Sequence, residues 1–162
     1  MALIVEQTDP RSPAATALLH ASHALMQSLF NPEENHFLSI EALCGDDVYF
    51  FTARDGAAMI ATGALALRGA EHARYGEVKS MFTDEAARGK GAAAAILRAI
   101  EDQARALGLP DLKLETGNTL HAAHRLYARH GFGICGPFGD YAPMPTSVFM
   151  HKPLPPSDPA AI

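Results

Sequence analysis

A group of basic and glycine residues in the middle of the chain has the composition of an anion-binding turn. Arg88–Ala93 has the sequence RGKGAA and follows an apolar run at Glu77–Thr83. Apolar residues then recur on one face of the segment at about Gly89–Leu107, which predicts an amphipathic helix. Backbone N–H groups at a helix start lack internal partners and favour negative charge. We therefore predict a phosphate site, to which Arg88 and Lys90 add positive charge.

A glycine-rich basic turn of this kind could belong to one of three types of phosphate-binding site. A P-loop is excluded, because a glycine follows Lys90 where Ser or Thr is required, and Asp84 occupies the position of the first glycine. A dinucleotide fingerprint, G-x-G-x-x-G/A, is formally present at Gly89, Gly91 and Ala94. That motif needs its first glycine directly after a strand, whereas here a polar stretch intervenes. The third ligand is the pyrophosphate of an acyl-coenzyme A.

The third alternative is supported by a family resemblance. RGKGAA resembles the Gln/Arg-x-x-Gly-x-Gly/Ala signature of the GCN5-related N-acetyltransferases, the GNAT superfamily, and Ala123–Phe132 resembles the family's second signature. The resemblance spans Gly76–Lys152. The segments Gly76–Met81, Leu114–Gly117 and Ser147–Met150 are most similar to the bacterial YsnE-like subgroup. The resemblance implies an N-acetyltransferase that moves an acetyl group from acetyl-CoA to an amine of a small molecule, by direct transfer in a ternary complex.

The order of predicted elements is strand, two helices, three strands, helix, strand, helix and two strands. It predicts an α/β fold with a mixed, mostly antiparallel sheet of about seven strands flanked by helices, compatible with the acyl-CoA N-acyltransferase fold. The predicted strands are Ala2–Glu6, Val48–Ala53, Ala57–Leu67, Tyr75–Thr83, Leu112–Glu115, Phe132–Cys135 and Thr146–Lys152. The remaining predicted helices are Ala14–Phe30, Leu38–Leu43 and Thr119–His130, the last capped by Asn118. Gly63, inside a predicted strand, indicates a bulge or a close backbone approach.

Length and composition limit the class of protein. At 162 residues the chain fits a single domain, which we place at residues 1–152, with the Pro-rich segment 153–162 as a disordered tail. A net charge of −5 argues against nucleic-acid binding. No apolar run reaches membrane-spanning length, and Met1–Asp9 lacks the pattern of a signal peptide. Cys44 and Cys135 are isolated, which favours a reducing, cytoplasmic setting.

Histidine pairs are the remaining candidates for a metal site. His20 and His23 are three residues apart on one predicted helix, and His121 and His124 are three apart on another. A metal pair needs further ligands, and no spacing identifies them. We therefore predict no metal. A homodimer stays open.

The resemblance implies which residues hold acetyl-CoA. The end of the central strand would pair its backbone with the pantetheine arm, and a backbone N–H near Phe82 would point at the thioester oxygen. The implied cofactor-binding residues are Met81, Phe82, Thr83, Arg88, Gly89, Lys90, Gly91, Ala92, Ala93, Asn118 and Tyr127.

Tyr127 is the candidate general acid, because it occupies the position of the family's tyrosine. An unperturbed tyrosine has a pKa of about 10, so it is protonated at neutral pH and can donate to a leaving thiolate. The alternative is a core tyrosine with a paired hydroxyl. Glu77 and Glu115 are the candidate bases, and an amine that loses its proton in solution needs neither. An ion pair with Lys79 or Arg74 is the structural alternative for Glu77.

Two positions depart from the family pattern. Lys79 stands where some members carry a glutamate base, and Leu120 stands where many carry an asparagine that contacts the cofactor. These departures keep a non-catalytic acyl-CoA sensor open beside the enzyme, and a dinucleotide-binding oxidoreductase is the more distant alternative. The loop before the last strand borders the acceptor pocket in this fold. Its implied substrate-binding residues are Phe138, Asp140 and Tyr141.

Overall fold

The computed structural model describes residues 2–156 of the chain. The strands are β1 (Leu3–Gln7), β2 (Val48–Asp55), β3 (Ala58–Arg68), β4 (Tyr75–Thr83), β5 (Asp111–Gly117), β6 (Gly133–Cys135) and β7 (Ser147–Pro153). The helices are α1 (Pro13–Leu29), α2 (Ile40–Leu43), α3 (Ala92–Ala106) and α4 (His121–Arg129). Short 3₁₀ turns lie at Pro32–Glu34 and Glu85–Ala87. The predicted order of helices and strands is confirmed.

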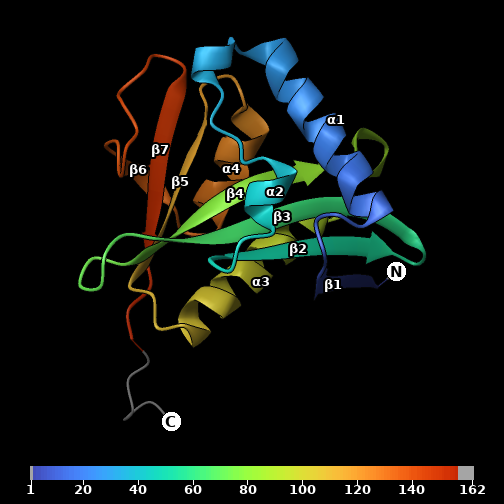
Figure 1. Cartoon of the computed structure of the whole chain (residues 1–162), viewed down its shortest axis with the longest axis horizontal. Helices are drawn as coiled ribbons and strands as arrows, with labels where there is room; N and C mark the ends of the chain where they lie inside the picture. Colours follow the sequence, from blue (N-terminus) through green and yellow to red (C-terminus); the bar gives the residue numbers. More distant parts are fainter. Residues whose placement is uncertain (1, 157–162) are drawn as a thin grey trace. The chain divides into compact units, whose positions relative to one another are not determined.

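Within residues 2–156 the strands form one seven-stranded sheet with the order β1-β2-β3-β4-β5-β7-β6 (Figure 1). The pairs β1–β2, β2–β3, β5–β7 and β6–β7 are antiparallel, whereas β4 pairs with β5 in parallel. The predicted α/β fold with a mixed, mostly antiparallel sheet is therefore confirmed. No helix in the described part of the chain is long and apolar enough to cross a lipid bilayer.

The chain divides into two compact units, and neither is a continuous stretch of sequence. The N-terminal unit comprises Met1–Ala66 and Val78–Ile100, and the C-terminal unit comprises Leu67–Glu77 and Glu101–Ile162. Both β4 and α3 therefore begin in one unit and end in the other. The expectation of a single domain at residues 1–152 stays a prediction.

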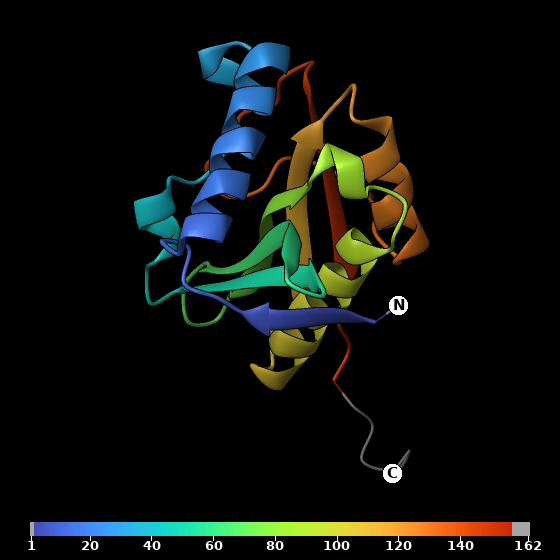
Figure 2. The ribbon, with the colours of Figure 1, turned by 90° about the vertical axis from the view of Figure 1, so that its right-hand side faces the viewer.

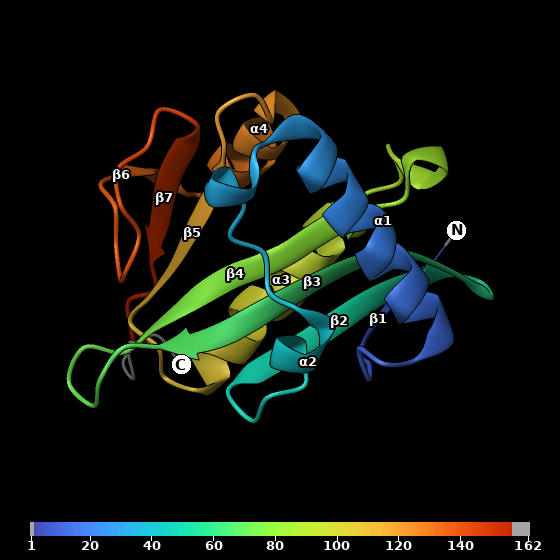
Figure 3. The same cartoon turned by 45° about the horizontal axis from the view of Figure 1, so that its top comes forward.

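In the N-terminal unit, α1 and α2 cover one face of the first strands (Figure 3). Their contact is an apolar cluster of fully or nearly buried side chains. The members of this cluster are Ala15, Leu19, Leu43, Phe50 and Ala64. Side chains alternate between the two faces along a strand. Phe51 therefore points to the opposite face, and its register partner Gly63 leaves that face without a side chain.

Helix α3 packs against that opposite face at Gly63. A Cβ placed on Gly63 would lie 2.6 Å from Met81 Sδ and closer still to Ile96 Cγ2. Ile96 and Ile100 of α3 are both completely buried. The close approach predicted from Gly63 is therefore confirmed, because only a residue without a side chain admits the helix at this distance. The bulge lies elsewhere, at a register shift between Ala53 and Arg54.

In the C-terminal unit, β5 pairs with β7 over its whole length, and Leu114 faces Met150 across the pair. Leu112, Leu114 and Thr116 alternate with partly exposed residues along β5, the pattern of a strand with one face in the core. Helix α4 lies along these strands (Figure 2). Its Tyr127 is buried and contacts the ring of Phe132 at 5.7 Å between centroids.

Most predicted boundaries differ from the structure by one or two residues, and the starts of α3 and α4 were wrong in a way that bears on the site. Helix α3 begins at Ala92 and not near Gly89, because Gly89 and Gly91 have left-handed φ angles of +86° and +80°. Helix α4 begins at His121 with Leu120 as its N-cap, so Asn118 is not the cap.

The predicted disorder of residues 153 and 154 is wrong. Pro153 ends β7, and Leu154 is buried, with its N–H donating to the carbonyl oxygen of Pro110 at 2.8 Å. The part of the predicted tail from 157 to 162 lies outside the described residues.

Gly63→Ala tests the close packing of α3. The added methyl group would overlap Ile96 and Met81, and overpacking of this kind costs about 1–3 kcal/mol of unfolding free energy. Urea denaturation followed by circular dichroism measures the loss. Gly133→Ala is the matched control, because a Cβ on this exposed strand glycine meets no atom within 4 Å. Equal stability of the two variants would contradict the packing argument.

Candidate functional site

The turn before α3 has the geometry of an anion cradle. Gly89 and Gly91 both have left-handed φ angles, and a Cβ placed on either would meet nothing within 4 Å. The side of the turn that these glycines present is therefore open. The Gly91 carbonyl oxygen accepts the first hydrogen bond of α3, from the N–H of Ala95 at 3.0 Å. The N–H groups that follow Gly91 have no acceptor within the helix, so they are suited to a phosphate oxygen.

Two cations and two alanines complete the turn. Arg88 and Lys90 are exposed, as expected for residues that meet a charged ligand, whereas Ala92 is buried. Ala93 is partly buried in the first turn of α3. The Lys90 ammonium forms an ion pair with Asp55 Oδ2 at 3.2 Å. The sequence did not indicate this partner.

The strand before the turn contains a backbone irregularity. Ser80 has a φ of +57°, the one left-handed residue other than glycine within residues 2–156. Its carbonyl oxygen accepts a hydrogen bond from Thr62 Oγ1 at 2.8 Å, which fixes the irregular backbone to β3. Met81 follows directly and packs under α3 near Gly63, while Phe82 and Thr83 are partly buried. Such strain in a strand is commonly found at functional sites.

Glu77 is the centre of the polar cluster in the C-terminal unit. Its side chain is only 4% exposed. Arg68 Nε donates to Oε1 at 3.1 Å, and the Tyr141 hydroxyl donates to Oε2 at 2.5 Å. Burial raises the pKa of Tyr141, and the charge of Glu77 and the hydrogen bond to it raise it further, so the phenol keeps its proton. The sequence did not identify Arg68 as a partner of Glu77.

An aromatic cluster surrounds this polar centre. Phe138 and Phe149 are buried, and Tyr141 contacts both rings, at 5.1 and 5.6 Å between centroids. Tyr75, two residues before Glu77 on β4, meets Phe138 edge-on at 5.7 Å. The ammonium of Lys113 lies 5.4 Å from the Tyr75 ring. The loop between β6 and β7 is thus held on the sheet by aromatic packing and by the bond to Glu77.

Glu115 lies on the neighbouring strand β5. Its Oε2 accepts a hydrogen bond from Ser147 Oγ on β7 at 2.9 Å, and its charge contributes to the raised pKa of Tyr141. The structure therefore brings together Glu77, Glu115, Phe138 and Tyr141, which the sequence indicated separately. Asp140 is exposed beside this cluster.

Tyr127 and Asn118 also belong to the C-terminal unit. Burial raises the pKa of Tyr127, so its hydroxyl is protonated at neutral pH. The Asn118 N–H donates to the carbonyl oxygen of Thr146 at 2.9 Å, and the side chain is exposed. This bond extends the β5–β7 pairing by one residue beyond Gly117 and Ser147, and the exposed Asn118 side chain is accessible to a ligand.

The two positions that depart from the family pattern have local contacts. Lys79 is buried, and its ammonium donates to the carbonyl oxygen of His36 at 2.8 Å, which ties β4 to the segment after α1. Leu120 precedes α4 as its N-cap.

The histidine pairs have structural contacts. His23 stacks on Phe37 at 4.2 Å between centroids; burial lowers its pKa, and the nearby His20 lowers it further. His124 Nε2 lies 2.8 Å from the carbonyl oxygen of Gly117. Within residues 2–156 no group of three or more His, Cys, Asp or Glu side chains could hold a metal ion.

A family model places this architecture among known enzymes. The model of the acetyltransferase (GNAT) family matches residues 17–132. The sheet, the glycine turn and the match together define an acyl-transferring α/β enzyme.

Relatives of similar length support the same class. The chain is 38% identical to the IAA acetyltransferase of Azospirillum brasilense over 150 residues, covering 93% of this chain and 97% of that protein. It is also 38% identical to the uncharacterized N-acetyltransferase YsnE of Bacillus subtilis over 135 residues, covering 82% and 87%. A Klebsiella pneumoniae protein assigned as an acyl-CoA N-acyltransferase is 30% identical, with a TM-score of 0.76 and coverage of 94% and 97%. The chain belongs to the GNAT family and is an acyltransferase.

Tyr141→Phe tests the hydrogen bond that holds the loop to Glu77. Hydrogen bonds to a charged group contribute about 1.5–3 kcal/mol to stability, so we expect a loss of that size in urea denaturation. Tyr49→Phe, at a partly buried tyrosine of β2, is the control and should change stability by less than about 0.5 kcal/mol. A loss for Tyr141→Phe no larger than that of the control would show that the bond contributes nothing.

Proposed function

We propose that this acyltransferase moves an acetyl group from acetyl-CoA to the amine of a small molecule. The observation that carries the proposal is the open turn at Gly89–Gly91, followed directly by the start of α3, in a chain of the GNAT family. The names of the similar proteins, an acyl-CoA N-acyltransferase and two acetyltransferases, support the same donor. A cytoplasmic setting is retained from the isolated thiols Cys44 and Cys135.

The residues of the turn fit the pyrophosphate of an acyl-CoA. The N–H groups at the start of α3 would donate to its oxygens, and Arg88 would face it as a cation. The β4 backbone from Met81 to Thr83 would pair with the pantetheine arm, as the family resemblance implies. The left-handed Ser80 sets the direction of the N–H groups that follow it. Asn118 is proposed to contact the same donor.

The chemistry is a direct substitution at the thioester. The neutral amine attacks the carbonyl carbon, a C–N bond forms, and the C–S bond breaks to release coenzyme A as a thiolate. A backbone N–H near Phe82 is proposed to stabilise the negative oxygen of the tetrahedral intermediate. Tyr127 is proposed to give its proton to the thiolate. Burial keeps the hydroxyl protonated but also makes it a weaker acid, so the proposed role rests on the position of Tyr127 in the family motif and not on its pKa.

The contacts of Glu77 bear on the choice of proton acceptor. A proton on Glu77 would remove the charge that pairs with Arg68 and weaken the bond from Tyr141. We therefore favour Glu115, or loss of the proton from the amine to water, over Glu77. In this scheme Glu77 is a positioning residue: by accepting the hydrogen bond from Tyr141 it anchors the loop with the proposed acceptor-binding residues Phe138, Asp140 and Tyr141.

The first test of the donor is thermal unfolding with acetyl-CoA, with NAD as the control for a dinucleotide site. Ligand at about 100 times its dissociation constant adds about 2.7 kcal/mol, which is roughly 5–10 °C for a chain of this size. Gly91→Glu should abolish the shift by filling and charging the turn. Gly108→Glu is the matched control, because Gly108 has a φ of +71° and open space but lies past the other end of α3. A full shift in Gly91→Glu would reject the site.

Tyr127→Phe tests the general acid and the sensor alternative together. We expect an affinity for acetyl-CoA close to wild type, and acetyl transfer slower by about 10²-fold or more. Thiol release from acetyl-CoA is measured with a panel of amino acids, polyamines and aromatic amines, with Tyr49→Phe as the control. Turnover unchanged by the substitution would refute the role of Tyr127. Tight binding of acetyl-CoA without turnover on any amine would favour the sensor.

A further inference from the structure

A carboxylate stands beside the proposed phosphate turn, where a polyanion has to bind. The Lys90 ammonium lies 3.2 Å from Asp55 Oδ2, and the side chains of Lys90 and Asp55 are 38% and 23% exposed. Lys90 lies between the open Gly89 and Gly91, so its charge belongs to the turn. Asp55 comes from a distant segment, the end of β2. The ion pair therefore joins the β2–β3 hairpin to the phosphate turn.

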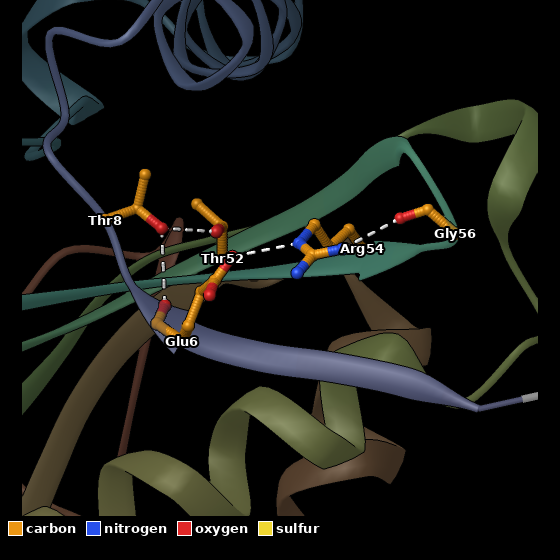
Figure 4. A network of polar contacts seen from close by, with 5 residues as sticks. All are labelled: Glu6, Thr8, Thr52, Arg54 and Gly56. Atoms are coloured by element: carbon orange, nitrogen blue, oxygen red, sulfur yellow. Dashed lines mark hydrogen bonds and ion pairs between the residues drawn. The ribbon is translucent and has the colours of Figure 1, made fainter.

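A network of polar contacts involves both chain neighbours of Asp55, Arg54 and Gly56 (Figure 4). Arg54 forms an ion pair with Glu6 of β1 at 2.9 Å, and its Nη1 donates to the carbonyl oxygen of Gly56 at 3.0 Å. Beside these contacts, Thr8 Oγ1 and Thr52 Oγ1 lie 2.6 Å apart and join the residue that follows β1 to β2. Asp55 thus lies between two residues that are hydrogen-bonded to each other, which restrains its backbone, and its carboxylate reaches Lys90 from there.

We propose that Asp55 lowers the affinity of the turn for the phosphates of coenzyme A by holding and neutralising Lys90. The inference rests on the proposed function, because it concerns the same phosphate turn. A phosphate that recruits Lys90 has to compete with the carboxylate, and the carboxylate itself repels a polyanion within about a Debye length, ~10 Å at 0.1 M salt. The acetylated donor and the released coenzyme A carry the same phosphates. Asp55 therefore also weakens the binding of the product, coenzyme A, and so favours its release after transfer.

Calorimetric titration with coenzyme A tests the proposal directly. Asp55→Asn keeps the size of the side chain and removes its charge. At 50 mM NaCl we expect this variant to bind coenzyme A about 3- to 10-fold more tightly than wild type. At 500 mM NaCl the gain should fall below about 2-fold, because salt screens interactions between exposed charges. An affinity equal to or weaker than that of wild type at 50 mM NaCl would overturn the proposal.

A double-mutant cycle tests whether Asp55 acts through Lys90. Lys90→Met should weaken binding of coenzyme A. In the Lys90→Met background, Asp55→Asn should increase the affinity for coenzyme A by less than half of the increase that it causes in wild-type protein. An undiminished gain would overturn the neutralisation of Lys90. Asp46→Asn, at an exposed position before β2, makes the same change in net charge and should leave affinity unaltered. A gain of the same size there would also overturn the proposal, because total charge and not the ion pair would be responsible.

Failure of the proposed function gives a different result. If wild-type protein and Asp55→Asn both fail to bind coenzyme A, the phosphate site is wrong, and the inference about Asp55 falls with it. If wild-type protein binds and Asp55→Asn binds no better, only the inference about Asp55 is wrong. Thermal unfolding of each variant without ligand shows that the fold is retained.

Discussion

The absence of a side chain at Gly63 is the constraint on which the packing of α3, and with it the position of the glycine turn before α3, depends. Side chains of Ile96 and Met81 occupy the space that a Cβ at this position would need, so any larger residue would force them to shift. The contact at Gly63 and the first turn belong to the same helix, so packing at Ile96 constrains where the helix begins. The left-handed glycines that lead into α3, and the N–H groups that it presents, are therefore placed by a packing contact along the body of the helix. Binding geometry here depends on core geometry.

In the C-terminal unit, a charged hydrogen bond and aromatic packing hold the loop before β7 in place. A buried carboxylate needs partners, and Glu77 obtains them from Arg68 and from Tyr141. The second of these contacts is also what secures an otherwise irregular loop. The rings of Phe138 and Phe149 pack against Tyr141, and a hydrogen bond is electrostatically stronger in such partly buried surroundings than in water. One ionised group thereby both satisfies its own burial and orders the residues proposed to meet the acceptor.

The sequence predicted much of the fold because the periodic patterns were strong. The run of strands and helices, the central strand at Tyr75–Thr83 and the close approach at Gly63 were all predictable. The start of α3 was not, since alanine and glycine do not reveal where φ becomes positive. Arg68 and Asp55 were missed for another reason: their partners are distant in sequence or depend on strand register, and pairing of that kind leaves no local pattern. Ser80 gave no signal, because nothing in its residue type predicts a left-handed φ.

The interleaved course of the chain has a consequence for how the protein can be assembled or divided. Leu67–Glu77 belongs to the C-terminal unit, yet Val78–Ile100 returns to the N-terminal unit before the rest follows. The parallel pairing of Glu77 with Lys113 closes only after the intervening turn and helix have been made. Such closure over a long separation slows folding. No single cut yields two segments that each contain a complete unit, so complementation between fragments would require them to intertwine and not merely to dock.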